Sequence, residues 1–166
     1  MKGPPLLPEE IFHRVLRLAR FDGLSVLAIA GLFALLAGAM GDWVGAVVGL
    51  LVAGAGAAEL HGVMRLRHGD PRGLRWLIGS QVFLLMSVLA YCALRLARPE
   101  LGPLRATVTS EMKEQLEVIG LTVDQFLGQL YRLVYLAVAL LTVLYQGGMA
   151  LYYYRRREAV ARALAM

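Results

Sequence analysis

The sequence predicts an all-α integral membrane protein: a four-helix bundle with an N-terminal interfacial amphipathic helix and a helical outer loop. Three observations lead there. The 166 residues are 58% hydrophobic and only 17% charged, whereas soluble domains carry about 25% charged residues. Four apolar runs are each long enough to approach a membrane span, and most lysines and arginines lie at the ends of these runs. The length fits a single membrane domain over residues 1–166.

The four apolar runs are predicted to be spanning helices. A helix needs roughly 20 residues to cross the hydrocarbon core, and lipid offers no partners for unpaired backbone groups. The expected spans are 24–40, 43–64, 74–96 and 126–154.

Two further segments are predicted to be helical without crossing the membrane. Residues 8–21 begin with Pro8 and two acids, and they alternate apolar and basic positions like a helix lying on the inner leaflet. The outer loop, 97–125, is the only sizeable polar region. Thr109 or Ser110 can cap a helix within it, while Thr122 and Gln125 form a capping box that opens the last helix.

The distribution of basic residues predicts the orientation. Of the 17 lysines and arginines, 12 lie in the N-terminal segment, the second connection and the C-terminal tail, and 5 lie on the opposite side. The positive-inside rule then places both termini in the cytoplasm, in a plasma or inner membrane. Because the net charge of +5 is not gathered on a soluble basic face, the expected partner is the lipid bilayer and not nucleic acid.

The second apolar run carries small residues at every fourth position. Gly45, Gly49, Ala53 and Ala57 would let another helix backbone approach closely, which is how helices associate in lipid. The neighbour could belong to the same chain or to a second copy. We expect a homo-oligomer that uses this helix.

The last run carries tyrosines and a threonine on one helix face. Tyr131, Tyr135, Thr142 and Tyr145 recur at spacings of three, four and seven residues. Polar-tipped aromatic rings need partners in lipid, so this face should point inward. It fits a packing interface between helices, and it also fits the lining of a pathway.

A polar site is predicted around an embedded acid. Arg65 marks the membrane surface, and Glu59 lies six residues inside it, at a depth of about 9 Å. Gln81 and Gln146 fall at similar depths on other helices, and His61 lies nearer the surface. An ionisable group in a membrane helix suggests function, so we expect an ion-binding or proton-linked site. Alternatively, Glu59 reaches headgroup water and only anchors its helix.

The sequence predicts no enzyme active site, no metal site and no cofactor. Its three histidines, His13, His61 and His68, are not spaced as ligands, and the single cysteine, Cys92, lies in an apolar run. Three functions remain open. The first is a homo-oligomeric channel or transporter, and the second is a non-catalytic subunit or scaffold that binds a partner membrane protein. The third is a membrane-embedded enzyme that uses Glu59 and His61 on a lipid-like substrate.

Overall fold

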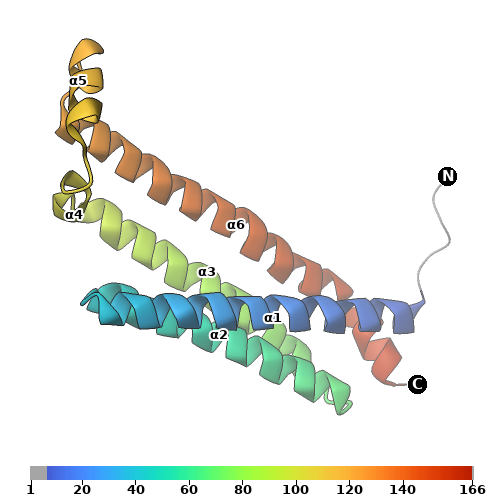
Figure 1. Cartoon of the computed structure of the whole chain (residues 1–166). Coiled ribbons are helices and arrows are strands. Elements are labelled where there is room, and N and C mark those ends of the chain that lie inside the picture. Colours follow the sequence, from blue (N-terminus) through green and yellow to red (C-terminus); the bar gives the residue numbers. More distant parts are fainter. Residues whose placement is uncertain (1–6, 166) are drawn as a thin grey trace, which may run out of the picture. The chain divides into compact units, whose positions relative to one another are not determined.

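The computed structural model describes residues 7–165, and every regular element in that range is a helix (Figure 1). The helices are α1 (Pro8–Ala39), α2 (Trp43–Arg67), α3 (Gly73–Ala97), α4 (Gly102–Arg105), α5 (Ser110–Val118) and α6 (Val123–Leu164). Four of them, α1, α2, α3 and α6, are long and apolar enough to cross a membrane. The predicted all-α class and the four apolar helices are therefore confirmed.

The described chain forms two compact units. The first contains the residues up to Val88 together with those from Val143 onward, and the second contains Leu89–Thr142. The first unit thus holds α1, α2, the N-terminal part of α3 and the C-terminal part of α6. The second holds α4, α5 and the remaining parts of α3 and α6.

The interfacial helix expected at 8–21 does not exist as a separate element. It is continuous with the first span in the 32-residue helix α1. Its apolar face is also not turned to lipid, because Val15 and Ala19 are fully buried in the core of the first unit. That core is formed by side chains of α1, α2, α3 and α6, namely Ile11, Val15, Leu16, Ala19, Val63, Leu66, Leu74, Leu77, Met149, Tyr153 and Val160.

The last helix is also longer than expected. It continues to Leu164, past residue 154 where the predicted membrane span ends. The tail contains no glycine or proline that would stop a helix, and Val160 is 1% exposed in the core of the first unit. Packing therefore extends the helix beyond the apolar run.

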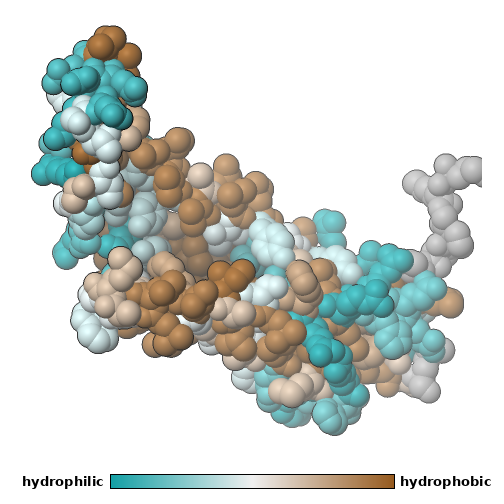
Figure 2. All heavy atoms as spheres, viewed as in Figure 1, coloured by the Kyte–Doolittle hydropathy of each residue, from teal (hydrophilic) through white to brown (hydrophobic). Residues whose placement is uncertain are grey.

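Figure 2 shows how hydropathy changes along α1. Hydrophobic side chains cover its C-terminal half, where large residues such as Ile29 and Leu35 are more than 70% exposed. Hydrophilic side chains gather toward its N-terminal end. An exposed apolar surface of this kind is typical of a helix in contact with lipid.

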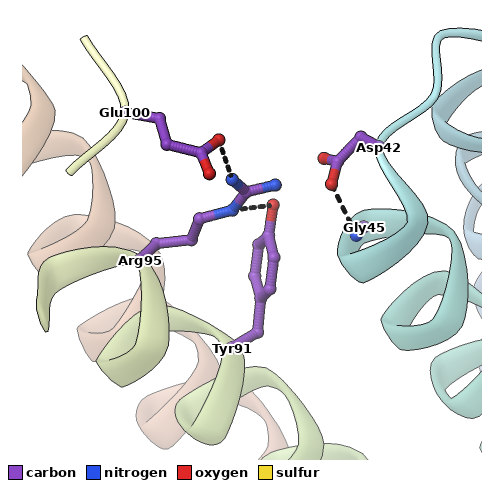
Figure 3. A network of polar contacts seen from close by, with 5 residues as sticks. All are labelled: Asp42, Gly45, Tyr91, Arg95 and Glu100. Atoms are coloured by element: carbon purple, nitrogen blue, oxygen red, sulfur yellow. Dashed lines mark hydrogen bonds and ion pairs between the residues drawn. The ribbon is translucent and has the colours of Figure 1, made fainter. Parts of the chain in front are cut away.

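A tight turn joins α1 to α2. Gly41 takes a φ of 79°, which glycine adopts without a steric penalty. Asp42 then caps α2, with its carboxylate accepting a hydrogen bond from the Gly45 backbone N–H at 3.0 Å (Figure 3). The short connection makes α1 and α2 an antiparallel hairpin.

The small residues of α2 pack against α1 of the same chain. A Cβ atom on Gly49 would lie 2.8 Å from the Cβ of Ala34, and one on Gly45 would lie 3.3 Å from the Cβ of Ala37. Ala53 is buried as well, but Ala57 is exposed, and Gly56 takes its place in the interface. Gly45 and Gly49 therefore pack against α1 of the same chain, and association of two copies through this helix stays a prediction.

The second unit contains the predicted caps. Thr109 accepts a hydrogen bond from the Met112 N–H at the start of α5. Thr122 and Gln125 form the reciprocal capping box, at 3.0 and 3.2 Å. Near the end of α3, the Arg95 guanidinium donates to the Tyr91 hydroxyl at 3.2 Å and to the Glu100 carboxylate at 2.9 Å (Figure 3).

Candidate functional site: a buried carboxylate cluster

Glu59 is buried inside the first unit. It is 1% exposed, and the hydroxyl of Tyr153 on α6 donates a hydrogen bond to its Oε1 atom at 2.8 Å. Tyr153 is itself fully buried. Within the structure, Glu59 is therefore held in the core between α2 and α6.

A second acid, Asp22 of α1, lies in the same place. It is 4% exposed, and its two carboxylate oxygens accept hydrogen bonds from Gln81 Nε2 at 2.8 Å and from the Tyr145 hydroxyl at 2.9 Å. The Glu59 carboxyl group also interacts with the side chains of Asp22 and Gln81. We call this group of five residues the carboxylate cluster: Asp22, Glu59, Gln81, Tyr145 and Tyr153.

Two glycines explain how the two acids meet. A Cβ atom on Gly56 would lie 2.8 Å from the backbone oxygen of Gly23, so the backbones of α1 and α2 touch there. Asp22 is next to Gly23, and Glu59 is one helical turn beyond Gly56. Close approach of the two backbones brings both short carboxylate side chains into one space.

The cluster contains two acids and no base. No lysine, arginine or histidine within residues 7–165 forms an ion pair or hydrogen bond with Asp22 or Glu59. Burial of two uncompensated carboxylates costs several kcal/mol per ion. A positive charge, either a proton or a bound cation, would remove that cost.

Two buried amide oxygens in the first unit have no hydrogen-bond donor. Gln81 Oε1 and Gln146 Oε1 are buried, and neither has a partner in the described part of the chain. Gln146 is 6% exposed and lies two helical turns before Tyr153 on α6. Such groups normally find a partner when they are buried. Gln81 thus adds an amide oxygen to the two carboxyl groups of the cluster, and hard cations prefer carboxylate and amide oxygens as ligands.

Two predicted site residues, Glu59 and Gln81, lie together in the cluster, and Gln146 is buried in the same unit. His61 is not part of it. That side chain is exposed, and its ring packs against Trp76 with the ring centroids 4.9 Å apart. No group of three or more His, Cys, Asp or Glu side chains that could hold a metal ion occurs in residues 7–165.

The four residues of the predicted tyrosine face do not share one set of neighbours. Tyr131 and Tyr135 pack against each other in the second unit, with ring centroids 4.6 Å apart. Thr142 donates back to the Val138 carbonyl of its own helix. Only Tyr145 reaches the carboxylate cluster. The lining of a pathway by these residues stays a prediction.

Sequence reasoning missed Asp22 and Tyr153, although the helical spacing could have indicated both. Asp22 follows the buried Val15 and Ala19 by seven and three residues, which places it on their face of α1. Tyr153 follows Gln146 by seven residues. Asp22 lies between the predicted interfacial helix, 8–21, and the predicted span, 24–40, so neither predicted element contained it.

Comparisons with known proteins give no family. No family model matches the chain, and neither the curated proteins nor the solved structures contain one that is similar to it. What the chain does is therefore inferred from the chemistry of the carboxylate cluster.

Proposed function

We propose that this chain is a small membrane channel or transporter, and that the carboxylate cluster takes up a cation on its way across the membrane. The observation that carries this proposal is the pairing of Asp22 and Glu59, two buried acids without a basic partner. Ionisable groups inside membrane helices usually mark ion or proton pathways. The cation is a proton or an alkali metal ion.

The balance of donors and acceptors supports a cation. Three donors form hydrogen bonds to the two acids: the hydroxyls of Tyr145 and Tyr153, and Gln81 Nε2. Both glutamine carbonyl oxygens remain without a donor. A cation is the partner that carboxylate and amide oxygens lack, and its charge offsets that of the acids.

The wild-type protein should conduct cations in liposomes. We expect purified protein to dissipate gradients of H⁺, Na⁺ or K⁺ faster than protein-free liposomes do, measured with a pH-sensitive dye and with radioactive tracer uptake. Chloride retention in the same vesicles is the control for leakiness. If no cation moves faster than in protein-free liposomes, with or without an imposed membrane potential, the proposal is wrong.

Both termini should lie in the cytoplasm. Ile11 of α1 and Val160 of α6 belong to one core, which supports placing the two ends at the same surface. The 12 basic residues near that surface, against 5 on the other side, favour the cytoplasm. A reporter enzyme that is active only in the cytoplasm should be active when it is fused at Met1 or at Met166. A reporter that is active only outside the cytoplasm should be inactive at both positions. Activity of an exclusively extracytoplasmic reporter at either end would reverse this orientation.

Self-association remains part of the proposal, because four helices enclose little space for a pathway. Since α1 covers Gly45 and Gly49 of α2, an oligomer has to use another apolar face. Large exposed side chains on α6, such as Leu136 and Leu140, provide one.

A second candidate function is a non-catalytic subunit that binds a partner membrane protein. The observation in its favour is an exposed apolar end of α5, where Val118 is 87% exposed and Ile119 is 65% exposed. Apolar side chains clustered outside the membrane commonly mark contact surfaces. Cation flux by the purified chain alone would favour the transporter over this subunit.

A further inference from the structure

A basic hollow lies beside α1 in the first unit. Its volume is about 730 Å³, and Arg17 and Arg20 of α1 and Arg67 of α2 reach it together. Phe21 and Leu24 contribute apolar walls. A pocket of this size is large enough for a small molecule or for part of a lipid.

The three arginines have no acidic partner within residues 7–165. Each is exposed, and none forms an ion pair or side-chain hydrogen bond there. The hollow is also lined by no aspartate or glutamate. Three guanidinium groups around one space repel each other unless an anion lies between them. Guanidinium forks match phosphate oxygens in shape as well as in charge.

The predicted start of the first membrane span places this hollow at the boundary between headgroups and hydrocarbon. Leu24 begins the first apolar run, and Arg17 lies seven residues nearer the N-terminus, a rise of about 10 Å along the helix. The headgroup layer on one side of a bilayer is several Å thick. On this placement, Arg17 and Arg20 fall at headgroup level, while Phe21 and Leu24 reach the first part of the acyl chains.

We propose that this hollow binds an anionic phospholipid, with the phosphate held by Arg17, Arg20 and Arg67 and an acyl chain lying along Phe21 and Leu24. A soluble polyanion would match the charges but not the exposed apolar wall. Phe21, for example, is 72% exposed. This site is separate from the carboxylate cluster and does not depend on the proposed function.

Native mass spectrometry of the full-length protein in detergent tests the site, with phosphatidylglycerol and phosphatidylcholine as probes. The wild type should retain phosphatidylglycerol in preference to phosphatidylcholine. The triple variant Arg17→Gln, Arg20→Gln and Arg67→Gln should bind phosphatidylglycerol on the order of 100-fold more weakly, because each arginine near an anionic lipid contributes about 1 kcal/mol.

A matched control variant carries the same loss of charge elsewhere: Arg14→Gln, Arg72→Gln and Arg75→Gln. These arginines do not line the hollow, so this variant should bind phosphatidylglycerol as the wild type does. Equal loss in both triple variants would mean that net charge alone attracts the lipid, and it would overturn the site. Glycerol phosphate, which lacks acyl chains, should not displace the lipid. Displacement at matched concentration would show that the ligand is a free phosphate compound.

Discussion

The Glu59→Gln variant should lose cation flux in liposomes while it folds like the wild type. Glutamine has nearly the shape of glutamate, and its amide oxygen can still accept the hydrogen bond from Tyr153. The change removes one of the two buried carboxyl groups that can ionise. Because a buried charge without a basic partner is unfavourable, its removal should leave stability unchanged or raise it. Flux should fall to the level of protein-free liposomes.

A control separates the site from a general effect of charge. Glu10 lies at the same end of the bundle but is exposed, so Glu10→Gln makes the same chemical change outside the carboxylate cluster. This variant should transport like the wild type. Thermal unfolding and elution volume in detergent check that both variants fold.

Asp22→Asn provides a second test of the same site, since Asp22 carries the other buried charge and accepts hydrogen bonds from Gln81 and Tyr145. Cation flux by the Asp22→Asn variant should fall as well. This variant therefore tests the site even if Glu59→Gln cannot be purified. Wild-type flux with unaltered pH dependence in both folded variants would show that the cluster is structural and not a cation site.

The Gly49→Leu variant should be strongly destabilised as a single chain. Any side chain at this position would meet Ala34 of α1, with its Cβ atom 2.8 Å from the Ala34 Cβ and 2.9 Å from the Ala34 Cα. Backbone atoms cannot move aside as a flexible side chain can. Overpacking typically costs about 1–3 kcal/mol and occasionally more, so the midpoint of thermal unfolding in detergent should fall clearly.

Gly54→Leu is the matched control on the same helix. A Cβ atom at Gly54 has no neighbouring atom within 4 Å, and leucine favours helix over glycine. Its unfolding midpoint should equal or exceed that of the wild type. If the two leucine variants unfold at the same temperature, α1 and α2 are not packed through Gly49. If Gly49→Leu remains stable but loses an oligomer, the small-residue ladder joins two copies after all.

The sequence by itself determined the elements whose causes are local. Apolar runs long enough to cross a membrane can only be helices, because lipid offers no partners to the backbone, and all four are present. Helix caps, in which a side chain forms a hydrogen bond with a backbone group three residues away, were equally predictable. Thr109 caps α5, and Thr122 and Gln125 form the capping box of α6.

Only the tertiary structure decided what each helix face contacts. The same face of residues 8–21 could cover lipid or a protein core, and the packing of Val15 and Ala19 made it a core. The glycines of α2 could serve a neighbour within the chain or outside it, and the short turn after α1 brought Ala34 against Gly49. The same turn packs α1 against α2 where Asp22 and Glu59 lie, and so brings the two acids together. Periodicity along one helix shows which residues share a face, but the neighbour of that face depends on the rotation and position of other helices.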